Sequence, residues 1–324
     1  MDRRDFNRRL ATLLGAGMLP AVNAHAAQVA LPSMIDLIVP FAPGGGTDQL
    51  ARALAQVVTP DFAGSNIVVE NKPGANGAIA ARFVSNQKAD GGTVLLGSSS
   101  TQALGPLILK FEIDPIKDLT PVSLLAEIAN VLVVPAESKI KTLADYIAYA
   151  KNHIVTFGSF GVGSSGHLYG LLFAAKEKIQ LTHVPYKGSS QAITDMLGGN
   201  VDSVFLTTSA VYGLAKAGKV RVLAVTGPHR TGLFPEVQTF KELAVRSLDF
   251  NGWFGLFAPK GTPPEIARSI ADRTNSATKD KDFVQRMKSE GYDWVGGGPQ
   301  ALDRELRSSI DIYKKILAKN PIKI

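Results

Sequence analysis

The sequence predicts an α/β protein with two lobes, each a mostly parallel sheet flanked by helices, joined by crossing strands. Three observations lead to this fold class. The chain has 324 residues, more than one domain usually holds. Buried strand patterns alternate with helical patterns, which is typical of parallel sheets. Glycine-rich or hydroxyl-rich loops follow several of these strands and open helices.

The first 26 residues have the pattern of an export signal. Arg3-Arg4-Asp5-Phe6 resembles a twin-arginine motif. The apolar stretch that follows is too short for the roughly 20 helical residues that span a bilayer. Ala24-His25-Ala26 then supplies the small residues of a signal-peptidase site. We therefore expect residues 1–26 to be a twin-arginine-like signal peptide, with a general secretory signal as the alternative.

The mature chain contains two runs of alternating elements. In the first run we expect strands over 35–39, 67–70 and 93–97, and helices over 48–58 and 77–85. In the second run we expect strands over 131–134, 154–157, 181–184, 202–205 and 221–225, with helices over 143–152, 166–176, 189–197 and 210–217. An aromatic-rich strand over 253–257 follows, and the remaining chain reads as helices over 264–277, 282–289 and 301–318.

The order of these elements predicts how the chain divides. Crossing strands are expected near 122–134 and 253–257, so that residues 27–124 plus 252–324 form lobe 1 and residues 125–251 form lobe 2. Loops at the carboxyl ends of the parallel strands then face the crevice between the lobes, which is the natural place for a ligand.

Composition and motifs exclude several functions. The chain has no cysteine, which excludes disulfides and thiolate chemistry. Its net charge of +7 is not gathered into a basic block with aromatic residues, so no nucleic-acid partner is expected. No HExxH motif or other metal-ligand spacing is present, and no serine lies in a G-x-S-x-G motif. We expect no metal, no catalytic residue and no enzymatic activity.

The first candidate loop is Pro43-Gly44-Gly45-Gly46-Thr47-Asp48, between a strand and a helix. Its glycines let the backbone approach a ligand closely, and the free N–H groups of the helix start attract an anion. A carboxylate fits this loop without any lysine or arginine. Asp48 would repel such an anion, so we expect it to be a helix cap that accepts backbone N–H bonds. The alternative is a tight turn without a ligand.

The second candidate loop contains Gly161, Gly163 and Gly166 in the spacing G-x-G-x-x-G, which is typical of dinucleotide binding. That function also needs an acidic residue after the next strand, where this chain has His183-Val184-Pro185-Tyr186-Lys187. We therefore expect no cofactor, and a second anion-binding loop in which Ser159, Ser164 and Ser165 are additional donors. An exported serine hydrolase, with His167 as general base, is an alternative.

The third candidate loop is Gly97-Ser98-Ser99-Ser100-Thr101-Gln102. Its hydroxyl groups suit either a polar ligand or the capping of a helix start, and both interpretations stay open. Tyr186-Lys187-Gly188-Ser189-Ser190 and Thr207-Thr208-Ser209 hold equivalent positions in the second lobe.

Together these loops resemble the substrate-binding proteins of tripartite tricarboxylate transporters, the Bug-type family. The resemblance covers the mature chain and rests on Ile38-Val39-Pro40-Phe41-Ala42-Pro43-Gly44-Gly45, Val69-Glu70-Asn71-Lys72-Pro73-Gly74-Ala75-Asn76-Gly77, Gly161-Val162-Gly163-Ser164, Val184-Pro185-Tyr186-Lys187-Gly188, Leu197-Gly198-Gly199-Asn200-Val201-Asp202 and Ala258-Pro259-Lys260-Gly261-Thr262-Pro263. It implies a type II periplasmic binding protein fold, a small carboxylate ligand, integral membrane subunits as partners and a location in the periplasm. We expect a monomer.

The resemblance also implies ligand contacts from Phe41, Gly45, Gly46, Thr47, Ser100, Thr101, Ser159, Gly161, Gly163, Ser164 and His167. Ser99, Phe160, Tyr186 and Thr207 complete the predicted ligand-binding set. The family often has proline where this chain has Phe160, and aspartate where it has Leu206. These departures favour a carboxylate without an amine, aromatic or apolar in character. A ligand sensor for a receptor kinase is an alternative to transport.

Overall fold

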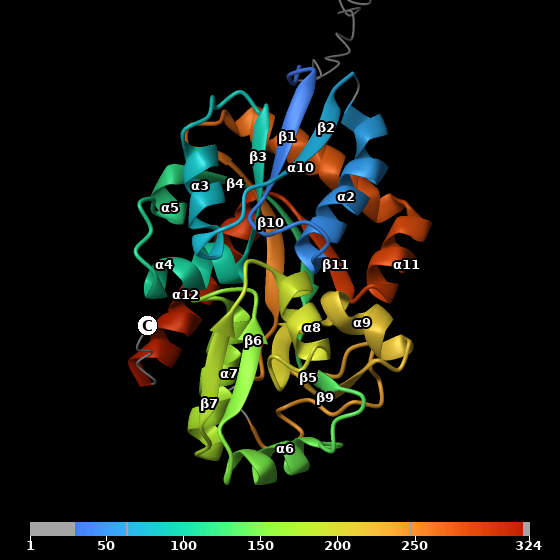
Figure 1. Ribbon diagram of the computed structural model, residues 1–324. Coiled ribbons are helices and arrows are strands. Elements are labelled where there is room, and N and C mark those ends of the chain that lie inside the picture. Colours follow the sequence, from blue (N-terminus) through green and yellow to red (C-terminus); the bar gives the residue numbers. More distant parts are fainter. Residues whose placement is uncertain (1–29, 63, 246–247, 320–324) are drawn as a thin grey trace, which may run out of the picture. The chain divides into compact units, whose positions relative to one another are not determined.

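Two β-sheets organise the part of the chain that the structure describes, residues 30–62, 64–245 and 248–319 of a computed structural model (Figure 1). Residues from Leu31 onward form one unit by their internal contacts. The predicted signal peptide, residues 1–26, lies outside the described residues. Within those residues, no helix is both long and apolar enough to cross a membrane.

The larger sheet has six strands in the order β11-β4-β10-β3-β1-β2. Their bounds are β1 Met34–Val39, β2 Asn66–Asn71, β3 Thr93–Ser98, β4 Leu119–Ile128, β10 Gly252–Pro259 and β11 Tyr292–Gly297. Strands β1, β2 and β3 are parallel, and β10 lies antiparallel between β3 and β4. We call the elements around this sheet lobe 1.

The smaller sheet has five strands in the order β7-β6-β8-β5-β9. Their bounds are β5 Asn130–Pro135, β6 Val155–Ser159, β7 Leu181–Pro185, β8 Ser203–Thr207 and β9 Val220–Val225. Strands β6, β7 and β8 are parallel, while β5 is antiparallel to both of its neighbours. We call the elements around this sheet lobe 2.

Helices follow most of the parallel strands. The α-helices are α2 Gly46–Val58, α3 Ala78–Ser85, α4 Gly105–Ile108, α5 Pro115–Asp118, α6 Leu143–Ala150, α7 Ser165–Glu177, α8 Ser189–Leu197, α9 Thr208–Lys216, α10 Pro264–Asn275, α11 Lys281–Ser289 and α12 Pro299–Lys319. Shorter helical turns are η1 Thr59–Phe62, η2 Ala75–Gly77, η3 Ser99–Leu104 and η5 Ser276–Lys279.

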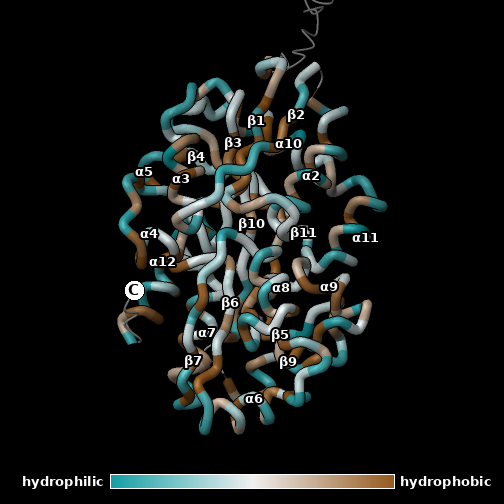
Figure 2. Tube along the Cα trace, in the orientation of Figure 1, coloured by the Kyte–Doolittle hydropathy of each residue, from teal (hydrophilic) through white to brown (hydrophobic). Residues whose placement is uncertain are grey.

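Apolar side chains at helical spacing attach these helices to the sheets. In α2, Leu50 and Leu54 are buried against Leu37 of β1, which explains why an alanine- and leucine-rich segment forms a helix there. In lobe 2, Phe157 of β6 packs against Phe205 of β8. Figure 2 shows hydrophobic segments along β1 and β3 and hydrophilic ones over outer turns.

The predicted fold class is confirmed, with two details that the sequence did not show. Both sheets are mixed, because β10 and β11 in lobe 1, and β5 in lobe 2, run against the other strands. The region after β10 is not all helical, since Tyr292–Gly297 forms the edge strand β11 beside β4. Tyr292 is buried and Asp293 is exposed, the alternation of a half-buried strand.

The chain passes between the lobes at two places. Only Ala129 separates β4 of lobe 1 from β5 of lobe 2, and the chain returns to lobe 1 at β10. The predicted division after residue 124 falls inside β4, so the exact lobe limits stay a prediction. The two crossings bring residues of both sheets to one region.

Candidate functional site

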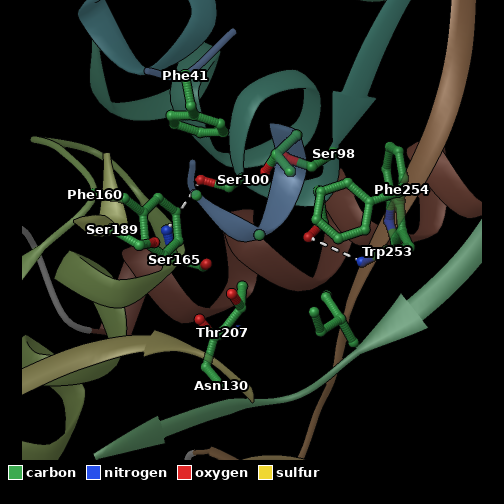
Figure 3. A pocket seen from close by; sticks show the side chains of 16 residues that line it. Phe41, Ser98, Ser100, Asn130, Phe160, Ser165, Ser189, Thr207, Trp253 and Phe254 are labelled. Carbon is green, nitrogen blue, oxygen red and sulfur yellow. Dashed lines mark hydrogen bonds between the residues drawn. The ribbon is translucent and has the colours of Figure 1, made fainter. Parts of the chain in front are cut away.

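A cavity lies where the carboxyl ends of the parallel strands of the two lobes meet (Figure 3). Its empty space, part of which is open to solvent, is about 480 Å³. The lining residues are Phe41, Gly45, Gly46, Thr47, Ser98, Ser99, Ser100, Ile128, Asn130, Phe160, Ser165, Ser189, Thr207, Gly252, Trp253 and Phe254. None of these described lining residues carries a charge, so their polar groups are hydroxyls, one side-chain amide, one indole N–H and backbone groups.

Helix starts converge on this cavity. Strands β1, β3, β6, β7 and β8 each end near it, and each is followed by a helix whose first turn or cap contributes a lining residue. These residues are Gly46 of α2, Ser99 of η3, Ser165 of α7, Ser189 of α8 and Thr207, the N-cap of α9. Helix N-termini carry partial positive charge and free N–H groups. The cavity therefore favours an anion although no cation lines it.

The acidic side chain of the first loop, Asp48, is held by hydrogen bonds with other residues, which partly offset its repulsion of an anion in the cavity. The carboxylate of Asp48 accepts the backbone N–H of Gly44 at 3.0 Å, the side-chain amide of Asn71 at 2.9 Å and the guanidinium of Arg52 at 3.0 Å. Burial acts to raise the pKa of Asp48, but these hydrogen bonds outweigh it and the pKa lies below its ordinary value. Asp48 accepts a backbone N–H as predicted, but the prediction that it caps the helix is wrong, because the N-cap of α2 is Gly45 and Asp48 is the third residue of the helix.

The third loop combines both roles that its sequence suggested. Ser98 is the N-cap of η3 and forms a capping box with Thr101. The next residue, Ser99, accepts the backbone N–H of Trp253 at 3.4 Å through its hydroxyl. Ser98, Ser99 and Ser100 also line the cavity, so this loop is a helix cap whose cavity side presents hydroxyl groups.

A hydrogen-bond network joins the lobes beside the cavity. The amide nitrogen of Asn76 in lobe 1 donates to the carbonyl of Gly163 in lobe 2 at 2.8 Å and to that of Ser100 at 3.0 Å. The hydroxyl of Ser100 donates to the amide oxygen of Asn76 at 3.2 Å and accepts the backbone N–H of Ser165 at 3.1 Å. These contacts fix the position of α7 relative to η3 in this structure, and we call the arrangement in which they are formed the closed arrangement.

Two stacked histidines form hydrogen bonds with residues of the second loop. The rings of His167 and His183 are stacked with centroids 3.9 Å apart. His167 Nδ1 accepts the backbone N–H of Gly163 at 3.2 Å, and His183 Nε2 is 2.7 Å from the hydroxyl of Ser159. Burial lowers the pKa of His167 to about 4 and that of His183, which also faces His167, to about 3. Both imidazoles are therefore neutral near pH 7.

Two phenylalanines, one from each lobe, separate the cavity from a wider outer hollow. Phe41 follows β1 and Phe160 follows β6, and their rings meet edge to face with centroids 5.5 Å apart. Both line the cavity and the outer hollow, which has Lys110 and Lys187 in its wall. A ligand that enters from the outer hollow has to pass this aromatic pair.

The structure brings part of the predicted ligand-binding set together. Phe41, Gly45, Gly46, Thr47, Ser99, Ser100, Phe160 and Thr207 line the cavity. The other predicted residues, which do not line it, are Thr101, Ser159, Gly161, Gly163, Ser164, His167 and Tyr186. They have internal contacts: Ser164 caps α7, and Tyr186 donates its hydroxyl hydrogen to Asp195 at 2.7 Å. Gly161 and Tyr186 line the outer hollow. Ligand contacts from these residues stay a prediction.

Several lining residues are absent from the predicted set. Ser98, Ser165 and Ser189 belong to loops that the sequence already indicated, next to residues that it selected. Ile128, Asn130, Gly252, Trp253 and Phe254 come from the crossing strands β4, β5 and β10. The sequence signal for this group was limited to Asn130, a polar residue within the apolar stretch 128–134 at a predicted crossing.

The geometry does not support the predicted alternative of a serine hydrolase with His167 as general base. Ser164 accepts the backbone N–H of His167 at 3.2 Å as the cap of α7, and the His167 ring accepts from the Gly163 backbone. Within the described residues, no group of three or more histidine or acidic side chains could hold a metal ion. The site consists of hydrogen-bonding groups and aromatic side chains around a partly open space, which is typical of a small-molecule binding site.

Comparison with known proteins places the chain in a family. Residues 50–321 match the model of the tripartite tricarboxylate transporter family receptor, and the chain belongs to this family. The predicted resemblance is thus confirmed. The chain is similar to Protein BugT of Bordetella pertussis, with 36% identity over 79% of this chain and 80% of that protein.

Two solved structures carry the comparison further. The chain is 32% identical to Rpa4515 of R. palustris, solved with adipate, over 89% of this chain and 97% of that one, with a TM-score of 0.84. It is 27% identical to MatC of Rhodopseudomonas palustris, solved with bound malate, over 89% and 100% of the two chains, also with a TM-score of 0.84. The family and these neighbours are solute-binding proteins and not enzymes, which confirms the predicted class.

Proposed function

We propose that this protein captures a small carboxylate in the cavity between its lobes and delivers it to the integral membrane subunits of a tripartite tricarboxylate-type transporter. The observation that carries the proposal is that the starts of five helices, which follow β1, β3, β6, β7 and β8, surround a cavity. None of the described residues that line this cavity is charged. Backbone N–H groups and hydroxyls bind a carboxylate by charge-assisted hydrogen bonds, which are stronger than neutral ones.

The comparisons support the ligand class. One neighbour was solved with adipate and another with malate, and both ligands are carboxylates. Membership of the transporter receptor family supports the membrane partners and a location in the periplasm. Residues 1–26 are proposed to be the export signal, lobe 1 to comprise 27–124 plus 252–324, lobe 2 to comprise 125–251, and the protein to act as a monomer.

The walls of the cavity support a ligand without an amine. No aspartate or glutamate is among its described lining residues, so an ammonium group would be buried without a counter-charge. Leu206, at the position where the resemblance to the family implies an aspartate, is fully buried in the lobe 2 core. Phe41, Phe160, Trp253 and Phe254 give the cavity large apolar surfaces, which suit an aromatic or apolar acid.

A thermal-shift screen of carboxylic acids tests the proposal. An acid that binds only the folded protein stabilises it and so raises its melting temperature. At a concentration 100 times its Kd, the acid increases the free energy of unfolding by about 2.7 kcal/mol. Benzoate, adipate, malate, aspartate and glutamate form the first panel, with the corresponding neutral amides as controls. We expect one or more amine-free acids to shift the melting temperature and their amides to leave it unchanged. No shift with any carboxylate would refute the proposed ligand class.

A further inference from the structure

Tyr292 lies directly behind the wall of the cavity. It is the first residue of β11, and its side chain is fully buried. Its partner on β4 is Ile128, and its ring packs edge to face against Phe254 with centroids 5.9 Å apart. Ile128 and Phe254 line the cavity, whereas Tyr292 is not among the lining residues. Any effect of Tyr292 on a ligand would therefore act through the residues that it holds.

The hydroxyl of Tyr292 reaches the first binding loop, where it donates to the carbonyl of Gly46 at 2.6 Å. Gly46 is the first residue of α2 and lines the cavity. Its carbonyl and the N–H of Thr47 belong to one planar peptide group and point in opposite directions. A donor that holds this carbonyl therefore also fixes the direction of the Thr47 N–H.

The N–H of Thr47 is one of the groups that can bind an anion. The first N–H groups of a helix have no partner within the helix, and Thr47 lines the cavity at the start of α2. Such a group binds more tightly when its direction is fixed before the ligand arrives, because ordering it on binding costs free energy. The hydroxyl of Tyr292 supplies this preorganisation.

Lobe 2 meets the same hydroxyl. The three atoms nearest to the position of a Cβ on Gly46 are the hydroxyl oxygens of Ser209, Thr207 and Tyr292. Ser209 forms hydrogen bonds with Tyr292 and, at 3.1 Å, with Thr207. Since the single hydrogen of the Tyr292 hydroxyl goes to Gly46, Tyr292 is the acceptor toward Ser209. A relay of hydroxyls thus joins Thr207 of lobe 2, which lines the cavity (Figure 3), to the first loop of lobe 1.

The backbone next to Tyr292 is also in contact with lobe 2. The hydroxyl of Thr208 lies 3.5 Å from the carbonyl of Gly291. A Cβ on Gly291 would lie 2.7 Å from the same hydroxyl, so the start of α9 approaches β11 closely. The relay therefore lies in a closely packed contact between the lobes in the closed arrangement.

We propose that Tyr292 is a positioning residue, which holds the first binding loop in the orientation that binds a carboxylate and ties this loop to lobe 2 through Ser209. The inference rests on the proposed carboxylate function and concerns the same site. It gives β11 a role in ligand binding although the strand supplies no residue that lines the cavity.

The change Tyr292→Phe isolates this role, because it deletes the hydroxyl and keeps the ring. The Gly46 carbonyl keeps its bond within the helix and Ser209 keeps Thr207, so the fold tolerates the change. The liganded state loses both the fixed peptide of the first loop and the link to lobe 2. We expect the Kd of a bound acid to rise about three- to tenfold, largely through faster dissociation.

Calorimetry and stopped-flow tryptophan fluorescence with malate, adipate and benzoate compare wild type, Tyr292→Phe and the matched control Tyr146→Phe. Tyr146 is also fully buried, and its hydroxyl pairs with that of Ser203 at 2.8 Å inside lobe 2. Urea titrations of the ligand-free proteins measure the stability that each variant loses. We expect Tyr146→Phe to bind each acid as wild type does, whatever stability it loses, and Tyr292→Phe to bind more weakly and release the acid faster.

The variant Ser209→Ala tests the link to lobe 2. It should raise the Kd, and the double variant with Tyr292→Phe should bind about as tightly as Tyr292→Phe alone, because the two hydroxyls act through one relay. If Tyr292→Phe does not fold, Ser209→Ala decides, and wild-type affinity in that variant would overturn the inference. Additive losses in the double variant would show that Ser209 does not act through Tyr292.

Two other results overturn the role of Tyr292. A Kd of Tyr292→Phe within twofold of wild type would show that its hydroxyl does not position the loop. An equal loss of affinity in Tyr146→Phe would assign the effect to general destabilisation. Failure of every acid to bind wild type would refute the proposed function and this role with it, whereas wild-type binding by Tyr292→Phe refutes the role alone.

Discussion

The side chain of Asn76 is a direct link between the lobes, and its removal should weaken ligand binding without unfolding the protein. Its amide donates across the cleft to the carbonyl of Gly163 at 2.8 Å. Asn76 itself has a left-handed backbone, with φ of 45°, which asparagine and glycine adopt more readily than other residues. Asn76→Gly therefore deletes the amide and keeps a backbone that tolerates this conformation.

The expected increase in Kd follows from the hydrogen bond that the closed arrangement loses in Asn76→Gly. In the closed arrangement the Gly163 carbonyl would be left without the donor that Asn76 supplies, which costs about 1–3 kcal/mol. In an open arrangement water can bond the same carbonyl, so the loss falls mainly on the closed state. Since about 1.4 kcal/mol corresponds to a factor of ten, the Kd of the bound acid should rise by roughly 5- to 150-fold.

Calorimetry with the tightest acid from the screen measures this change, and stopped-flow fluorescence of Trp253, which lines the cavity, measures the dissociation rate. The matched control is Asn86→Gly, because Asn86 is exposed at the end of α3 and bonds only within lobe 1. We expect faster dissociation for Asn76→Gly and wild-type behaviour for the control. A Kd within twofold of wild type would show that this contact does not stabilise the liganded state.

Two further perturbations test other parts of the site. A methyl group at Gly46 would overlap the hydroxyl of Ser209 in the opposite lobe, so Gly46→Ala should raise the Kd about tenfold through overpacking of about 1–3 kcal/mol. Gly213→Ala, with open space around it, should bind as wild type does. Equal affinities of Gly46→Ala and wild type would refute the close approach. For His167, whose pKa falls from 6.5 to about 4 on folding, the unfolded chain takes up a proton first as the pH drops. The free energy of unfolding should thus decrease between pH 6.5 and pH 4, by about 3 kcal/mol from this residue, and stay constant above that window. Urea titrations of the wild type and of the double variant His167→Asn/His183→Asn over this pH range measure the free energy of unfolding. A double variant with the same pH dependence as the wild type would refute the assignment of this effect to the buried histidines.

The sequence predicted the alternation of strands and helices because the apolar strands and glycine-rich loops are local features. It did not predict β11, whose six residues lie among helices and include Gly296 and Gly297. The alternation of buried Tyr292 with exposed Asp293 was the only local signal, and it is short. Its strand character depends on pairing with β4, which is more than 160 residues earlier in the chain.

The binding loops were predictable to a similar degree. The glycines and Thr47 of the first loop and the hydroxyls after β3 line the cavity because strand ends meet at one edge of a sheet, a general rule for parallel sheets. Asn130 and Trp253 were not predictable in this way. They lie in apolar strands, and only the antiparallel insertion of β5 and β10 brings them to the cavity.

A crystal structure of the protein with the acid that binds most tightly tests the central claim most directly. We expect the carboxylate oxygens within about 3 Å of backbone N–H groups at residues 45–47 and of hydroxyls at residues 98–100, with no lysine or arginine in contact. A carboxylate that paired with Lys110 or Lys187 in the outer hollow, or that bound away from the helix starts, would contradict the account.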